Sequence, residues 1–225
     1  MFFAIIFDMD GVLVEFKIDY MRLRGDIINY LTMVGVPRNL LSMEDLVFTT
    51  IIKGISFLRR KLGFSKEHIL KVLEECNRIV EYYETRAAMK LSIKDDAIEV
   101  LSFLKSKGVK LALYTMNTVK VVETFDSRKR FTHFFDIVVA RRGTQVLKPN
   151  RTLLAKIVEK LNAPVSKVAI VSDSPIDIVP ARELGLTTMM ISRDPERIRK
   201  ARPHMLFPDF ESFKEYIFSL YSESA

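Results

Sequence analysis

The sequence contains little cysteine and histidine, and each shortage excludes a class of site. One cysteine among 225 residues excludes a disulfide framework and any zinc site built from cysteines. Three histidines without an H-E-x-x-H pattern disfavour a zinc hydrolase. The cysteine, Cys76, lies on the same face of a helical pattern as Ile69, Val72 and Tyr83. We therefore expect a buried structural thiol there rather than a nucleophile.

The sequence also lacks any apolar run long enough to span a membrane. An apolar strand begins within the first few residues, which leaves no room for a signal peptide. These two features predict a cytoplasmic protein with no membrane partner. The 48% hydrophobic content is enough for a substantial core, and the length suits one large or two small domains. Abundant Lys, Arg and Glu beside a single Gln is typical of a thermophile.

The formal net charge of +7 favours anionic ligands, through long-range steering more than through a specific site. The basic clusters at residues 59–61, 128–130 and 197–202 are far apart in the sequence and lack interleaved aromatic residues. We interpret them as solvated faces and expect no nucleic acid partner. A basic nucleic-acid-binding protein is the alternative, which salt-dependent binding to DNA would reveal.

The stretch around which the chain is organised is residues 4–13, AIIFDMDGVL. Its apolar start reads as a strand buried on both faces. Asp8 and Asp10 follow on one side of that strand, and the turn at Gly11 re-aims them. Two close carboxylates repel each other and need a cation, which for oxygen ligands is most plausibly Mg²⁺. The alternative is a solvated Asp-Gly turn that ends the strand.

Residues 15–90 show helical periodicity and no convincing strand. One helical pattern ends at Gly35, and residues 42–45 resemble a capping box that opens the next helix. A further helical piece ends at Gly63, and Ser65 caps a long amphipathic helix. The segment is therefore predicted to be an all-helical insertion.

From residue 92 onward, strands alternate with helices. This alternation predicts right-handed crossovers and a doubly wound parallel sheet of the α/β class, covered by helices on both faces. The predicted strands after the first are 109–114, 136–140, 168–171 and 187–191, and the helices between and after them include 153–161, 175–184 and 209–220.

Polar side chains follow several of these strands, at the sheet edge where ligands of such folds bind. They comprise a carboxylate pair, a hydroxyl, two further carboxylates and a lysine: Asp8, Asp10, Thr115, Asp173, Asp177 and Lys148. Singly, each has a structural explanation. Asp177 is the acid of a well-formed helix start at Ser174-Pro175, Thr115 suits a strand end, and Lys148 suits an exposed loop. Their joint placement indicates a site in which a phosphate bridges a metal and a lysine.

Four segments together resemble the motifs of the haloacid dehalogenase superfamily, in order: residues 7–13, the strand that ends at Thr115, Lys148-Pro149, and residues 171–177. The resemblance covers essentially the whole chain and is greatest to phosphoglycolate phosphatase-like and β-phosphoglucomutase-like members. It implies a Rossmann-like core of residues 1–14 and 91–225 with a C1 cap at 15–90.

Some positions depart from the usual pattern of that superfamily. Ser172 stands where a glycine commonly precedes the fourth-motif aspartate, and Glu15 replaces a common Asp at the cap junction. Met116 follows Thr115 where a small or amide residue is frequent, and Asn117 is expected to take over that contact.

The resemblance also implies a mechanism. Asp8 would attack phosphorus and become an aspartyl phosphate, while Asp10 would protonate the leaving alkoxide and later activate water. The metal would be held by Asp8, by the backbone carbonyl of Asp10 and by Asp173, with Asp177 supporting it directly or through water. Thr115 and Lys148 would bind phosphoryl oxygens.

The expected function is hydrolysis of a small phosphorylated metabolite, with the cap choosing the substrate. By resemblance, a specificity loop lies around residues 50–54, which makes Lys53 a candidate contact for a substrate anion. Two alternatives stay open: a phosphomutase of the β-phosphoglucomutase type, and a non-catalytic phosphate-sensing or phosphoacceptor module. The sequence does not indicate an oligomeric state.

Overall fold

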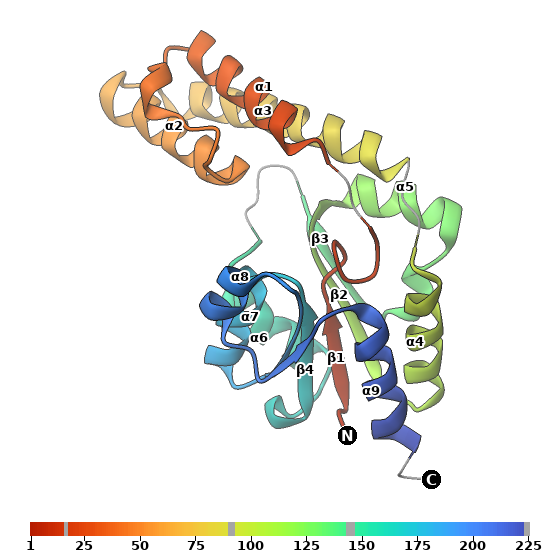
Figure 1. Cartoon of the computed structure of the whole chain (residues 1–225). Helices are drawn as coiled ribbons and strands as arrows, with labels where there is room; N and C mark the ends of the chain where they lie inside the picture. Colours follow the sequence, from red (N-terminus) through yellow and green to blue (C-terminus); the bar gives the residue numbers. More distant parts are fainter. Residues whose placement is uncertain (16–17, 90–92, 143–146, 223–225) are drawn as a thin grey trace.

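A parallel sheet forms the centre of the larger part of the molecule (Figure 1). The computed structural model describes residues 1–15, 18–89, 93–142 and 147–222. Within these residues the sheet has six strands in the order β3-β2-β1-β4-β5-β6, and every neighbouring pair is parallel. The strands are β1 (Ala4–Phe7), β2 (Lys110–Thr118), β3 (Ile137–Arg141), β4 (Val168–Ser172), β5 (Thr187–Ile191) and β6 (Met205–Phe207).

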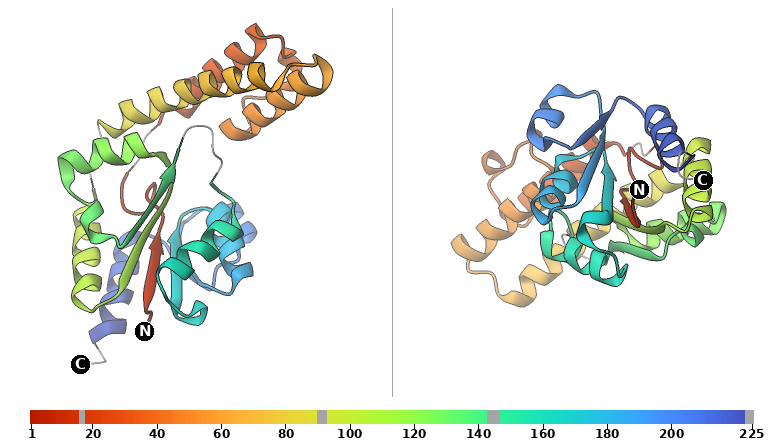
Figure 2. Two further views of the ribbon diagram at one scale, coloured as in Figure 1. Left: turned by 180° about the vertical axis from the view of Figure 1, so that it is seen from behind. Right: turned by 90° about the horizontal axis from the view of Figure 1, so that it is seen from below.

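Helices cover both faces of the sheet, as the alternation of the sequence predicts (Figures 1 and 2). Successive residues of a strand point to opposite faces, so Ile5 and Phe7 join one core cluster while Ala4 and Ile6 join the other. The first face is covered by α4 (Asp95–Ser106), α5 (Val119–Lys129) and α9 (Phe210–Ser222), and the second by α6 (Arg151–Lys160), α7 (Pro175–Leu184) and α8 (Pro195–Ala201).

The sheet order places a switch point between β1 and β4. The chain builds β1, β2 and β3 toward one edge and then crosses to the other side of β1 to form β4. In open α/β sheets the ligand crevice lies beyond the carboxyl ends of the strands at such a point. The residues that follow β1 and β4 are therefore the ones to examine for function.

A helical cap lies at this end of the sheet (Figure 1). Residues 18–89 contain no strand, and their helices enclose a separate apolar cluster that includes Leu31, Leu58 and Cys76. Burial raises the pKa of the Cys76 thiol to about 12, which suits the inert structural role predicted for it. The cap helices are α1 (Tyr20–Met33), α2 (Val47–Lys61) and α3 (Lys66–Ala88), and the 3₁₀ turns of the chain are Arg38–Leu40, Thr132–Phe134 and Val165–Lys167.

The predicted boundaries of cap and core, 14/15 and 90/91, remain predictions. Residues 16–17 and 90–92 lie outside the described residues, so both junctions fall next to or within segments that the structure does not describe.

Three predictions for the cap are wrong. Residues 42–45 do not open a helix: α2 begins at Val47, and Ser42 Oγ accepts from the backbone N–H of Glu44 in a turn. The piece predicted to end at Gly63 is helical, but it is the last part of α2, which ends at Lys61, and not a separate helix. Residues 50–54, predicted as a loop, lie inside α2. Gly54 allows α2 to pack closely against α1, because a Cβ at this position would lie 2.8 Å from Leu31 Cδ1.

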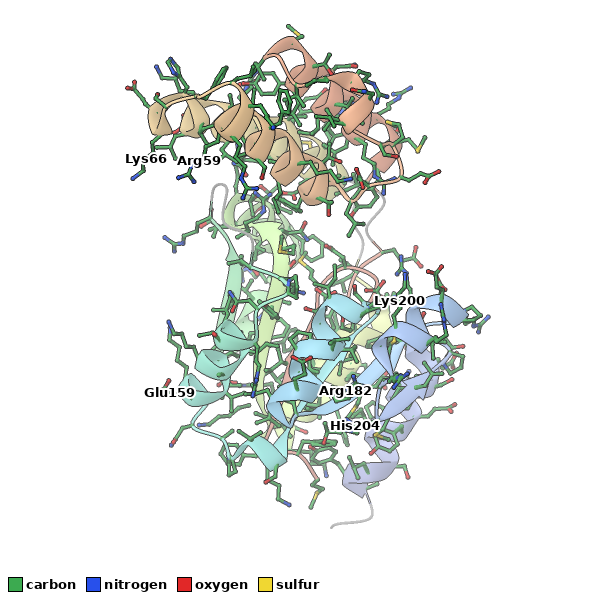
Figure 3. The ribbon with its side chains drawn as sticks, turned by 90° about the vertical axis from the view of Figure 1, so that its left-hand side faces the viewer. Arg59, Lys66, Glu159, Arg182, Lys200 and His204 are labelled. Carbon is green, nitrogen blue, oxygen red and sulfur yellow. The ribbon has the colours of Figure 1, made fainter. Side chains whose placement is uncertain are left out.

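Two further features bear on partners. Within the residues described, no helix is both long and apolar enough for a membrane span. Arg59 belongs to one basic cluster and projects from the cap, whereas Lys200 belongs to another and projects from the core (Figure 3). Lys200 is also paired with Glu196 at 2.7 Å. The two clusters thus lie on different parts of the molecule.

Candidate active site

The ends of β1 and β4 come together so closely that only glycine fits between them. Gly11 has a φ of +75°, and a Cβ on it would lie 2.6 Å from Asp173 Oδ2. Phe7 pairs with Val171 in the sheet, and the N–H of Asp8 donates to the carbonyl of Val171. Hydrogen bonding of the two strands and the close approach of Gly11 to Asp173 therefore bring Asp8 and Asp173 to the same end of the sheet.

A buried lysine joins two of the carboxylates. Lys148 Nζ donates to Asp8 Oδ1 at 2.8 Å and to Asp177 Oδ2 at 2.9 Å. Burial alone would lower the pKa of Lys148, but the two carboxylates outweigh it and raise the pKa. Ser172 Oγ also donates to Asp177 Oδ2, at 2.7 Å. The serine that departs from the superfamily pattern thus orients a carboxylate of the site.

Asp10 has a different environment from Asp8. The amide nitrogen of Asn117 lies 2.8 and 3.0 Å from the two carboxylate oxygens of Asp10. Burial, followed by the nearby charge of Asp8, raises the pKa of Asp10 to about 8. A carboxyl group with such a pKa holds a proton near neutrality and can give it to a leaving group.

Thr115 and Asn117 lie inside a strand that is longer than predicted. β2 continues to Thr118, and its register against β3 shifts between Tyr114 and Thr118. The N–H of Asn117 donates to Thr115 Oγ1 at 3.1 Å within this irregular stretch. The amide of Asn117 contacts Asp10, and the intervening Met116 lines the same cavity beside it.

The remaining carboxylates lie in electrostatically unfavourable positions. Burial, followed by the charge of Asp8, raises the pKa of Asp173 to about 6, although Arg197 lies 3.3 Å away. Burial likewise raises the pKa of Asp177 to about 6, and its Oδ1 is buried without a hydrogen-bond partner. An orphaned buried oxygen and neighbouring carboxylates with raised pKa values fit a binding site for a cation.

The donor set of the site suits a hard divalent ion, since it consists of carboxylate oxygens. Asp8, Asp173 and the main-chain carbonyl of Asp10 are the groups that could hold it. In the described part of the chain, no three Asp, Glu, His or Cys side chains are already gathered as a metal-holding group. Lys148 and Arg197 instead contact the carboxylates of Asp8 and Asp173.

Lys53 is not brought into this constellation. It lies on α2, and its ammonium is 2.7 Å from Asp45 Oδ2 within the cap. The loop expected around residues 50–54 is helical, so it does not place Lys53 beside the substrate. Contact between Lys53 and a substrate remains a prediction.

Sequence reasoning missed a buried ion pair that ties the cap to the core. Arg141 lies at the end of β3, and Glu84 lies on α3. Nη2 of Arg141 donates to both carboxylate oxygens of Glu84, each at 3.0 Å. The Arg141 guanidinium also bonds Asn77 Oδ1 and the carbonyl of Met116, and lies 5.4 Å from the centre of the Phe48 ring. Nothing in the local sequence pattern marks Arg141 as buried, because its partners lie far away in the chain.

The site and its fold define the class of protein. The model of the haloacid dehalogenase-like hydrolase family matches residues 4–185, and the chain belongs to that family. It is 26% identical over 214 residues to the phosphoglycolate phosphatase of Haemophilus influenzae, a match that covers 91% of this chain and 93% of that one.

Two further relatives show how broad the likeness is. Pyrophosphatase PpaX of Bacillus mycoides is 29% identical over 119 residues, which is 53% of this chain and only half of that relative's length. The β-phosphoglucomutase of Clostridium difficile has the same fold: its crystal structure matches 99% of this chain and 98% of its own with a TM-score of 0.68 and 18% identity.

Proposed function

We propose that this hydrolase is a Mg²⁺-dependent phosphatase that removes the phosphoryl group from a small soluble phosphate monoester through a phosphorylated Asp8. The observation that carries the proposal is that Asp8 and Asp10 have different surroundings. Asp8 accepts from Lys148 Nζ at 2.8 Å, whereas burial and the charge of Asp8 raise the pKa of Asp10 to about 8. One carboxylate is thus prepared to attack and the other to donate a proton.

In the first step, an oxygen of Asp8 forms a bond to phosphorus while the bond from phosphorus to the alkoxide of the ester breaks. Asp8 Oδ1 accepts from Lys148 and from the N–H of Met9, whereas Oδ2 has a longer contact, 3.5 Å from Ser172 Oγ, so we assign the attack to Oδ2. Asp10 gives its proton to the departing alkoxide and becomes a carboxylate. Asn117, whose amide donates to Asp10, positions it for that transfer.

In the second step, Asp10 accepts a proton from a water molecule as that water bonds to phosphorus. The bond between phosphorus and Asp8 then breaks, which releases inorganic phosphate and restores both side chains. Lys148 and the hydroxyl of Thr115 bind phosphoryl oxygens in this scheme and balance the charge that spreads over them. The Mg²⁺ ion, when bound by Asp8 and Asp173, supplies further charge neutralisation for those oxygens.

Hydrolysis of p-nitrophenyl phosphate tests this function. We expect turnover that requires Mg²⁺ and is lost after chelation, and that Asp8→Asn abolishes. Wild-type protein that shows no metal-dependent turnover would contradict the proposal. A phosphomutase would instead need a sugar bisphosphate to restart each cycle, and a phosphate-sensing module would take up a phosphoryl group without turnover.

A further inference from the structure

A small cavity opens beside Asp10, between the cap and the ends of the strands. Its volume is about 70 Å³, and its walls come from α1, α2, α3 and the end of β2. Its lining is mainly apolar and comprises Ile18, Leu23, Val47, Phe48, Val80 and Met116, together with Asp10, Tyr20, Glu84 and Asn117. A substrate whose leaving oxygen meets Asp10 would have its leaving group in this space.

A second cavity adjoins the same two side chains, Phe48 and Val80, within the cap. It has a volume of about 140 Å³, lies between α2 and α3, and shares the side chains of Phe48 and Val80 with the first. Its further walls are Ile51, Ile52, Ile55, Ser56, Leu73, Cys76 and Asn77. Apolar side chains therefore line both the space beside the proposed proton donor and the neighbouring cap cavity, where ligand hydrocarbon could be buried.

Among the described residues, the walls of the two cavities offer a substrate anion no cationic partner. None of the described residues that line the two cavities is a lysine or an arginine, whereas Asp10 and Glu84 are both carboxylic acids. The arginine behind them, Arg141, has its guanidinium engaged by Glu84 and by Asn77. Lys148 is likewise engaged by Asp8 and Asp177 on the far side of the reaction centre. A second anion on the substrate would lose its hydration against these apolar walls without gaining an ion pair from the residues that line them.

We infer that the substrate's leaving group is an uncharged alcohol whose hydrocarbon part lies against Phe48 and Val80 and reaches between α2 and α3. This inference rests on the proposed phosphatase function and names its substrate class. It also separates this chain from two of the relatives it resembles. The leaving group of phosphoglycolate carries a carboxylate and that of pyrophosphate is itself a phosphate, so both would bring an anion into this mainly apolar space.

Ethyl phosphate and phosphoglycolate form a matched pair for the test, because a methyl group in one replaces a carboxylate in the other. We expect kcat/KM to be at least tenfold higher for ethyl phosphate. Along the series from ethyl to butyl phosphate, kcat/KM should rise by about fourfold for each methylene that becomes buried. A flat series, or faster hydrolysis of phosphoglycolate or pyrophosphate, would overturn the inference.

Two variants on α3 test whether the rise of kcat/KM with chain length comes from burial in the cap cavity. Leu73 lines that cavity, whereas Leu70, one turn away, is 47% exposed and lines neither cavity. We expect Leu73→Lys to flatten the chain-length series and Leu70→Lys to preserve it. If Leu73→Lys does not fold, calorimetric binding of ethyl and butyl phosphate to Asp8→Asn replaces it, and equal affinities would count against the inference.

The outcomes distinguish the inference from the function on which it rests. Hydrolysis of p-nitrophenyl phosphate together with a preference for phosphoglycolate would refute the inference and leave the phosphatase function standing. Failure to hydrolyse any of these esters, p-nitrophenyl phosphate included, would refute both.

Discussion

Lys148 Nζ lies 2.8 Å from Asp8 Oδ1, and both side chains are almost completely buried. The two residues are 140 positions apart in the chain, so the fold alone creates this contact. A buried ion pair of this kind stabilises the native state only while both partners are present, because the loss of one leaves an uncompensated charge. The proposed catalytic group and the stability of the core are therefore linked.

Lys148→Met should impair both activity and stability. Loss of a charged group that binds the phosphoryl oxygens is expected to lower kcat by about 10²–10³-fold. The unpaired carboxylates of Asp8 and Asp177 should lower the free energy of unfolding by roughly 3–5 kcal/mol at pH 7. Steady-state kinetics and urea unfolding measure the two effects.

Lys105→Met is the matched control for that variant. Lys105 forms an exposed ion pair with Asp136 at 3.1 Å, and such pairs contribute about 0–1 kcal/mol. An equal loss of stability in both variants would contradict the proposed importance of the buried contact.

Asp10→Asn should slow the hydrolysis of an ester most when its leaving group must be protonated to depart. An asparagine cannot give a proton to a leaving alkoxide, so we expect kcat for butyl phosphate to fall by about 10²–10⁴-fold. p-Nitrophenolate leaves without protonation, so formation of the phosphoenzyme from p-nitrophenyl phosphate should fall much less. Equal losses of the first step with both esters, measured by rapid mixing, would argue against Asp10 as the proton donor.

Gly11→Ala should lower the affinity for Mg²⁺ in addition to lowering the stability of the fold. The substitution strains a backbone with a φ of +75° and moves Asp173, since the added Cβ would lie 2.6 Å from its carboxylate oxygen. Gly108→Ala is the control, because its φ is +73° but nothing lies within 4 Å of the added Cβ. We expect both to lose about 1–2 kcal/mol of stability. Only Gly11→Ala should lower the Mg²⁺ affinity measured by calorimetry.

The ion pair between Glu84 and Arg141 predicts a pH dependence of stability. Burial raises the pKa of Glu84 from its ordinary 4.5 to about 6, although Arg141 opposes the shift. The folded state thus binds the proton of Glu84 more tightly than the unfolded state. Protonation of Glu84 therefore stabilises the fold fully below pH 4.5, and this stabilisation is lost as pH rises through 6. The stability of wild type relative to Glu84→Gln should fall by about 2 kcal/mol across that interval.

Chemical denaturation of both proteins from pH 4 to pH 8 measures this difference. A difference that stays constant across the range, or that grows with pH, would show that Glu84 does not ionise as described. Glu84→Met combined with Arg141→Met should cost less stability than the sum of the two single variants, because neither charge is then left alone in the interior.

Much of the core could be predicted from the sequence because its signals are local. The helix over 175–184 and the strand over 187–191 have the predicted bounds, since Ser174, Pro175 and Gly185 fix the ends of the helix. The class of fold followed from the alternation of such elements. Asp8 could be placed at a strand end because a fully apolar run precedes it.

The cap could not be predicted to the same depth. Gly54 looks like a loop residue in sequence, but it lies inside α2 because Leu31 packs against it. The pairing of Arg141 with Glu84 spans 57 positions and joins two units, so no periodicity reveals it. The resemblance places Lys53 in a loop that this chain does not form. Lys53 instead lies on α2 and pairs with Asp45.

The most direct test of the central claim is to detect the phosphoryl group on Asp8. Asp10→Asn protein mixed with p-nitrophenyl phosphate and Mg²⁺, then quenched in acid, should release one p-nitrophenolate per enzyme in a burst and retain one phosphoryl group. Peptide mass spectrometry should place that group on Asp8, and Asp10→Asn combined with Asp8→Asn should give neither burst nor label. Label on another residue, or undiminished hydrolysis by Asp8→Asn, would contradict the account.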